Sequence, residues 1–221
     1  MKNTIIAATL AALAGSASAA TISWSSTAYT TNGSAGQNLD TGLFLTTGTE
    51  FLVENVGGAA TTFDGIDFTA DSGLFGSAIA NTFHASSSDL SDSGRYGSSG
   101  ADTISLSGLT IGQTYRIQAL VFDGRGSAGI TGRTVSFDGI DQGQYANGVS
   151  GVTWGDGLLV TGTFTADATD QDFTIEAFDG ASSVGGQLNA LLVHNTTAIP
   201  EPTSTAFVGL AGLGLLLRRR R

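Results

Sequence analysis

The chain of 221 residues contains no cysteine, which excludes disulfide bonds and thiol chemistry. Residues 21–197 hold 18 of the 19 acidic residues and only four arginines, so this region carries a formal charge of −14. An acidic surface of this kind does not bind nucleic acid or an anionic membrane by charge, and we predict no nucleic-acid partner.

The N-terminus has the pattern of a secretion signal. Lys2 supplies a positive charge, Ile5–Leu13 form a short apolar segment, and Ala17-Ser18-Ala19 provide the small residues that signal peptidase accepts. A membrane-spanning helix is the alternative, but the apolar run is short for that role. We therefore predict a signal peptide at residues 1–20 and export of the remainder.

Apolar residues in the central region recur with period two. Tyr115, Ile117, Ala119 and Val121 alternate with their neighbours, as expected of a β-strand with one buried face. No segment shows amphipathic helical spacing, so we predict a single all-β domain at residues 21–197, an antiparallel β-sandwich of the jelly-roll kind. The predicted strands are Ile22–Ser25, Leu43–Thr46, Glu50–Val56, Thr61–Phe63, Thr103–Leu106, Tyr115–Phe122, Thr134–Phe137, Leu158–Phe164, Phe173–Phe178 and Leu188–Val193.

The tripeptide Phe-Asp-Gly occurs four times, beginning at Phe63, Phe122, Phe137 and Phe178. Glycine adopts positive φ without strain, and aspartate hydrogen-bonds nearby backbone, so each copy predicts a strand that ends in a tight turn. An alternative is that some of these aspartates meet at one end of the sandwich and bind calcium.

Two glycine- and serine-rich stretches, residues 86–100 and 139–157, are predicted to be loops. The first is alternatively a linker that divides the chain into two domains. A single domain is favoured because the part before it, about 65 mature residues, is small for an independent fold without disulfides.

Three residues are candidates for sugar binding. Trp154 and Tyr145 lie in the second predicted loop, where an aromatic ring would form a platform, and Arg125 would donate hydrogen bonds to sugar hydroxyls. The alternative for Trp154 is burial in the core, which is the commoner place for a lone tryptophan.

Asp167, Asp170 and Asp172 form the densest acidic group of the central region. Calcium prefers several carboxylate oxygens on flexible loops, so these residues are candidate ligands of a structural calcium ion, the one cofactor we consider. A solvated acidic turn is the alternative. The spacing does not match that of an EF-hand.

Support for catalysis is thin. His194 ends the last predicted strand, which suggests exposure, and neither a nucleophile-elbow motif nor a zinc-type histidine pair occurs. A glycosidase-type carboxylate pair remains an alternative, because acidic residues are plentiful. We predict that the protein is not an enzyme.

Residues 198–221 form a tripartite tail. Pro200, Glu201 and Pro202 make a short motif that the two prolines hold extended. An uncharged segment follows from Thr203 to Leu217, long enough for a minimal membrane-spanning helix when arginine side chains reach the interface. The chain ends with a basic stop, which places the C-terminus in the cytoplasm by the positive-inside rule: Arg218, Arg219, Arg220 and Arg221.

This tail resembles the PEP-CTERM sorting signal of Gram-negative bacteria in the order of its three parts. The resemblance covers about a tenth of the chain. It implies that the protein is held in the inner membrane through the C-terminal helix and is then processed by an exosortase, a membrane cysteine transpeptidase that passes its substrates to the cell surface or extracellular matrix. A plain C-terminal membrane anchor is the alternative.

From Thr103 to Val193, the rhythm of strands and turns also resembles galactose-binding and other carbohydrate-binding jelly rolls, which implies sugar binding without identifying a site. We therefore predict an exported, non-catalytic surface or matrix protein that is sorted by an exosortase and binds extracellular polysaccharide. The alternatives are a secreted glycan-active enzyme of the glycoside hydrolase type and a purely structural envelope protein.

Overall fold

The computed structural model describes residues 19–30, 39, 41–75, 90, 93–97, 99–123, 131–148 and 155–197. The regular secondary structure in these residues consists of β-strands alone, which confirms the all-β prediction. The strands are β1 (Ser23–Thr30), β2 (Thr49–Asn55), β3 (Thr61–Phe63), β4 (Ile66–Ala70), β5 (Arg95–Tyr96), β6 (Asp102–Ser107), β7 (Thr114–Val121), β8 (Thr131–Phe137), β9 (Ile140–Gly148), β10 (Gly155–Thr165), β11 (Asp170–Asp179), β12 (Ser182–Ser183), β13 (Gln187–Leu188) and β14 (Ala190–Asn195).

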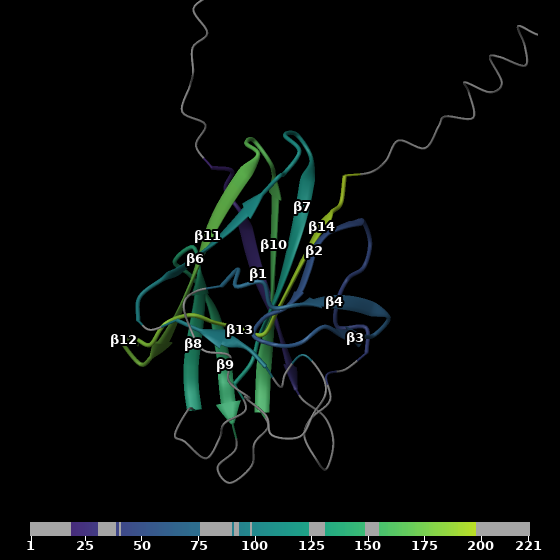
Figure 1. Ribbon diagram of the computed structural model, residues 1–221. Coiled ribbons are helices and arrows are strands. Elements are labelled where there is room, and N and C mark those ends of the chain that lie inside the picture. Colours follow the sequence, from purple (N-terminus) through teal and green to yellow (C-terminus); the bar gives the residue numbers. More distant parts are fainter. Residues whose placement is uncertain are drawn as a thin grey trace, which may run out of the picture.

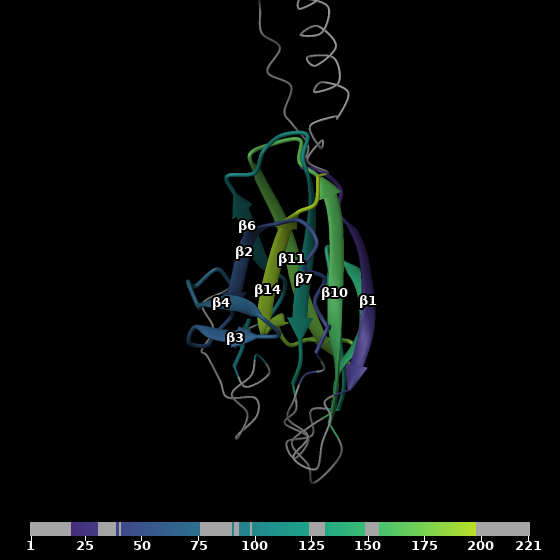
Figure 2. The same ribbon diagram turned by 90° about the vertical axis from the view of Figure 1, so that its right-hand side faces the viewer.

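Strands β2, β14, β7, β10 and β1 lie side by side in that order and are called the central sheet here (Figure 2). Strands β6, β11, β8 and β9 pair in that order and are called the second sheet (Figure 1). A short pairing of β9 with β10 joins the two sheets. The pairing of β2 with β4 is parallel, so the prediction of a purely antiparallel arrangement is wrong at this point.

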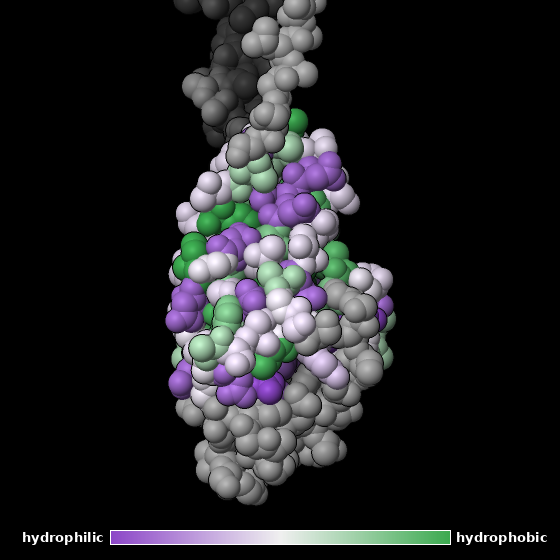
Figure 3. Space-filling view, turned by 90° about the vertical axis from the view of Figure 1, so that its left-hand side faces the viewer, coloured by the Kyte–Doolittle hydropathy of each residue, from purple (hydrophilic) through white to green (hydrophobic). Residues whose placement is uncertain are grey.

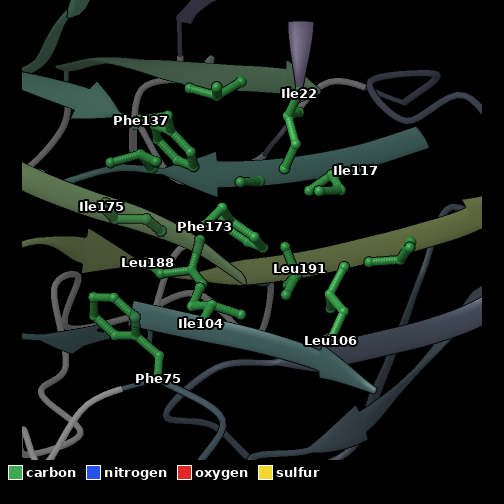
Figure 4. Close-up of a cluster of buried hydrophobic side chains, with 14 of the residues drawn as sticks. Ile22, Phe75, Ile104, Leu106, Ile117, Phe137, Phe173, Ile175, Leu188 and Leu191 are labelled. Atoms are coloured by element: carbon green, nitrogen blue, oxygen red, sulfur yellow. The ribbon is translucent and has the colours of Figure 1, made fainter. Parts of the chain in front are cut away.

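The main core lies between the two sheets. Ile117, Ala119 and Val121 of β7 point toward it, as do Phe173 and Ile175 of β11, and all five are fully buried. Figure 4 shows side chains from both sheets pointing toward one another in this space. The period-two pattern in the sequence arises because each strand directs every second residue into this core.

A second apolar cluster lies on the opposite face of the central sheet and is called the cover cluster here. Leu120 of β7 and Leu192 of β14 point into it, away from the main core. The β3–β4 hairpin and residues from irregular segments cover it. Its buried members are Tyr29, Leu39, Phe44, Val53, Ile66, Phe68, Leu90, Leu120, Phe122, Leu159, Ala190 and Leu192.

Residues 43–48, called the strap here, cross the same face of the central sheet. The predicted strand Leu43–Thr46 is wrong, because no residue of the strap is in a strand. The backbone N–H of Leu45 donates to Oε1 of Gln118 at 2.8 Å, and Nε2 of Gln118 donates to the Leu45 carbonyl at 2.9 Å. Arg116 also donates to the carbonyls of Leu45 and Thr47. The backbone of the strap therefore forms hydrogen bonds with side chains of β7 and not with the backbone of a neighbouring strand.

Three of the Phe-Asp-Gly copies end a strand in a tight turn as predicted, and the copy at Phe122 runs beyond the described residues. In the copy at Phe178, Asp179 ends β11 and Gly180, with φ of 60°, begins the turn to β12. Asp64-Gly65 connects β3 to β4 and Asp138-Gly139 connects β8 to β9, and all four residues have positive φ. Positive φ at both central residues is the geometry of a type I′ hairpin turn. Asp138 also accepts a 2.8 Å hydrogen bond from the indole N–H of Trp24, which ties this turn to β1.

The predicted loop at residues 139–157 is largely wrong, because residues 140–148 form β9 and β10 begins at Gly155.

The outer face of the second sheet is polar. Exposed residues there alternate with core residues and include Thr103 and Ser105 of β6 and Asp170 and Asp172 of β11. Figure 3 shows hydrophilic and hydrophobic residues interspersed on this side of the molecule.

Candidate functional site

Of the three residues predicted to bind sugar, only Tyr145 falls within the described residues. It lies in β9 and is 1% exposed, so the prediction that it forms an open aromatic platform is wrong. Trp154 and Arg125 lie outside the described residues, as do the sorting motif and the arginine stop at residues 200–202 and 218–221. In the part of the chain that the structure describes, no helix has the length and apolar character needed to cross a membrane.

The three aspartates predicted to bind calcium are all exposed at the β10–β11 turn and on β11. Asp167 lies in the turn, Asp170 begins the strand and accepts a 2.9 Å hydrogen bond from the Thr169 hydroxyl, and Asp172 follows two residues later. Among the described residues, no group of three or more acidic or histidine side chains is arranged to hold a metal ion. Calcium binding therefore stays a prediction.

The most distinctive local feature of the central sheet is a β-bulge in β2. Leu52 pairs with Val193 and Glu50 pairs with His194, so Phe51 is an extra residue without a partner on β14. A bulge disrupts the alternation of side chains. As a result, the adjacent residues Phe51 and Leu52 both pack against the main core while remaining partly exposed.

A hollow of about 420 Å³ lies beside this bulge. Its size falls within the range of about 300–1,000 Å³ that is usual for small-ligand sites. It extends from β2 to β6, two strands that belong to different sheets. We call it the apolar hollow, and its lining is Phe51, Leu52, Leu74, Ser105, Leu106, Ser107 and Gly108.

Phe51, the aromatic residue of the apolar hollow, packs on the buried ring of Tyr115. Phe51 contacts Tyr115 edge to face, with ring centroids 5.3 Å apart. Tyr115 is buried, stacks on Phe164 and directs its hydroxyl to accept the Thr110 backbone N–H at 2.9 Å. The partly exposed ring of Phe51 therefore packs on a buried aromatic pair, and the hydroxyl-bearing residues Ser105 and Ser107 of β6 line the same hollow.

A second hollow, of about 240 Å³, adjoins the first, and Phe51 and Leu52 line both. Its other lining residues are Glu50, Val53, Asp67 and Thr69, so we call it the acidic hollow. Two hydrogen bonds fix its rim. The Thr69 hydroxyl donates to the Val53 carbonyl at 2.7 Å, and the Thr62 hydroxyl donates to Oδ1 of Asp67 at 2.7 Å.

His194 is buried on β14 between Glu50 of β2 and Arg116 of β7, so the prediction that it is exposed is wrong. Burial lowers the pKa of His194, the charge of Arg116 lowers it further, and Glu50 acts in the opposite direction. The imidazole is therefore neutral at pH 7. Its Nδ1 has no hydrogen-bond partner among the described residues.

Arg95 and Arg133, two of the three arginines among the described residues, lie close to carboxylates that line neither hollow. Arg95 forms an ion pair with Asp71, and Arg133 lies 3.7 Å from a carboxylate oxygen of Asp179. Burial acts to raise the pKa of Asp71, but the hydrogen bond and charge of Arg95, with backbone hydrogen bonds, bring it below its usual value. Neither of these ion pairs involves Glu50 or Asp67.

Sequence reasoning missed this site because its position depends on strand register. Glu50–Val56 is predicted as a strand, but a bulge becomes visible only when β2 is aligned with β14. The one available signal is the consecutive apolar pair Phe51-Leu52, which breaks strict alternation.

No family model matches the sequence, and no curated protein matches it either. Among solved structures, the ANX1 ectodomain from Arabidopsis thaliana is similar with a TM-score of 0.47 and 13% identity, over 70% of this chain and 52% of that chain. A complex of the plant peptide RALF23 with FER and LLG2 gives a TM-score of 0.46 and 15% identity, over 76% and 54%. A beta-glucuronidase from Bacteroides uniformis gives 0.41 and 16%, over 65% and 18%.

The chain spans about half the length of the two plant structures and less than a fifth of the beta-glucuronidase. Similarity at this level carries no argument about ligand or activity.

Proposed function

We propose that the protein is an exported, non-catalytic component of the bacterial surface or extracellular matrix that binds polysaccharide. In this proposal, an exosortase sorts it through residues 198–221 after transient anchoring in the inner membrane. The signal-peptide pattern at residues 1–20 and the tripartite tail support export and sorting, because both ends agree on passage across the inner membrane. The domain between them is proposed to be a β-sandwich of the jelly-roll kind.

The apolar hollow is the observation that carries polysaccharide binding. A sugar ring has an apolar C–H face that packs on aromatic side chains and a rim of hydroxyls that need polar partners. The ring of Phe51 offers the first, and the exposed serines Ser105 and Ser107 at the border of the hollow offer the second. The hollow lies between β2 and β6, which belong to different sheets, so a long polymer would reach it from the side of the molecule without threading through the fold.

Binding is tested by titrating the purified protein with a panel of oligosaccharides and following affinity by calorimetry. Phe51→Ala should weaken binding by about tenfold or more, because it removes the central contact surface. Phe51→Leu is the matched control, since it keeps much of the apolar volume and should weaken binding less. Hydrolysis of any panel member would instead support a glycan-active enzyme, and absence of any binding would leave a purely structural role.

Sorting is tested independently of binding by measuring the intact mass and cell fraction of the native protein. Cleavage near Pro200–Pro202 with release to the surface or medium is expected. The double variant Pro200→Ala/Pro202→Ala should keep its tail and stay in the inner membrane. Normal release of that variant would contradict recognition of the motif and favour the plain anchor.

A further inference from the structure

The acidic hollow adds charge to the proposed polysaccharide site. Glu50 and Asp67 are both exposed and approach it from different strands, β2 and β4. Phe51 and Leu52 form the wall shared with the apolar hollow. A ligand whose apolar face rests on Phe51 therefore lies next to two carboxylates.

The net charge of the central region strengthens this field, and one nearby cation, Arg116, offsets part of it. The central region has a formal charge of −14. Arg116, the cation of the described residues closest in register to Glu50, donates its guanidinium hydrogens to the strap at Thr47 and Leu45. A uronic-acid polysaccharide would be repelled by such a surface, whereas a cationic polymer would be attracted.

The bulge argues against a peptide as the occupant. The outer edge of β2 from Thr49 to Val53 lies outside its pairing with β4, which involves only Glu54 and Asn55. A peptide strand would need a regular ladder of N–H and C=O groups along this edge. The extra residue Phe51 interrupts that ladder in its middle, and bulges of this kind protect edge strands from added strands.

From these three observations, and resting on the proposed function, we infer that the two hollows form one binding site for a cationic polysaccharide that carries free amino groups on its sugar rings. One sugar ring packs on Phe51 in the apolar hollow. The ammonium group of the same or the next ring lies in the acidic hollow and pairs with Glu50 and Asp67. The polymer class is thus a de-N-acetylated amino-sugar chain.

Three oligomers of equal length test this inference with the full mature protein: glucosamine, N-acetylglucosamine and galacturonic acid. Calorimetry should show the tightest binding for the glucosamine oligomer, weaker binding for its N-acetylated form and none for the uronate. The preference should shrink as salt is raised, because partly exposed charge pairs are screened.

Charge-removing variants locate the preference. Glu50→Gln and Asp67→Asn should each weaken glucosamine binding by about two- to fivefold, the usual contribution of an exposed ion pair, and leave N-acetylglucosamine binding unchanged. Asp167→Asn is the matched control, because it removes the same charge from an exposed residue that lines neither hollow. Thermal unfolding of each variant verifies that the fold is retained.

Failure of this inference is distinguishable from failure of the proposed function. Equal affinity for the charged and N-acetylated oligomers, with binding still dependent on Phe51, would overturn the cationic class but keep polysaccharide binding. No affinity for any glycan in the wider panel would overturn both. A basic peptide that competes with the glucosamine oligomer and binds more tightly would show that the occupant is a protein strand.

Discussion

The two faces of the central sheet are covered in different ways. The main core faces a second sheet, and its members come mostly from long paired strands. The cover cluster faces a short hairpin, the strap and isolated residues such as Leu39 and Leu90. The main core lies between two sheets, and backbone hydrogen bonds between strands hold each of them. The cover of the other face is held in part by side-chain hydrogen bonds, such as those of Gln118.

This difference explains the sequence of β7 and β14. From Ile117 to Val121 every residue of β7 is buried, because both faces of the strand are covered. A buried polar residue in such a strand needs internal hydrogen bonds, and Gln118 makes two with Leu45. A nearly continuous apolar run that contains one glutamine therefore indicates a sheet covered on both faces, one cover being irregular chain.

Truncating neighbouring leucines of β14 tests whether the two faces are equally rigid. Leu191 points into the main core and Leu192 into the cover cluster, and both are fully buried. We expect Leu191→Ala to lower the free energy of unfolding by about 3–5 kcal/mol, because two paired sheets cannot close around the cavity. Leu192→Ala should cost about 2–3 kcal/mol, since the strap and hairpin can settle inward.

Urea unfolding measures both values, and each variant is the control for the other because the same atoms are removed from adjacent positions. An equal or larger loss for Leu192→Ala would show that the cover cluster is packed as rigidly as the main core.

A buried asparagine connects the end of β7 to the segment before β5. Asn189, fully buried between β13 and β14, accepts the Phe122 backbone N–H at 2.7 Å and donates to the Ser93 carbonyl at 2.7 Å. Asn189→Ala leaves both groups without this partner, so the free energy of unfolding should fall by about 2–4 kcal/mol. Asn189→Asp keeps an acceptor for Phe122 but presents a carboxylate to the Ser93 carbonyl.

Both variants are compared with the parent protein by urea unfolding at pH 7. A loss below about 1 kcal/mol for the alanine variant would mean that water or neighbouring groups replace both hydrogen bonds.

Much of the main core could be predicted from the sequence, but little of the cover. The strands β7, β10, β11 and β14 carry apolar residues with a clear pattern, and two Asp-Gly turns follow from local chemistry alone. Strand β9 was missed because Asp141, Gly143 and Asn147 have low strand propensity, and pairing with β8 overrides it.

The candidate site was hidden for a related reason. The position of Phe51 depends on the register of β2 against β14, and the hollow depends on how two sheets meet, which are both tertiary properties. Tyr145 shows the opposite error. Its glycine-rich neighbourhood suggested a loop, yet the ring belongs to the main core.

Equivalent glycines in the two regions offer a smaller test of cooperativity. Gly65 turns the hairpin of the cover and Gly139 turns the hairpin of the second sheet, with φ of 77° and 74° and no atom within 4 Å of an added Cβ. Alanine at either position should therefore cost only the backbone strain of left-handed φ, about 1–2 kcal/mol. Equal shifts of the urea midpoint would show that the hairpin of the cover unfolds with the rest. The opposite result would be a shifted urea midpoint for Gly139→Ala only, together with faster hydrogen exchange near residue 65 in the Gly65→Ala variant. It would show that the β3–β4 hairpin of the cover opens before the rest of the protein unfolds.

The smallest expected effect is a pH dependence of the unfolding free energy that arises from His194, on the face of the central sheet that the strap crosses. Burial and the charge of Arg116 lower the pKa of His194 in the folded protein below the usual 6.5, against the opposing charge of Glu50. The unfolded chain then binds a proton more readily than the folded one between these two pKa values. The contribution of His194 to the unfolding free energy is therefore fully present above about pH 6.5. It falls as the pH drops from the unfolded to the folded pKa of His194 and levels off below the folded pKa. His194→Gln removes the titrating group, so its unfolding free energy, measured by urea from pH 7.5 to 5, should fall less over this range than that of the parent. Parallel curves for the two proteins would show that the pH dependence arises from carboxylates elsewhere and not from the face that the strap covers.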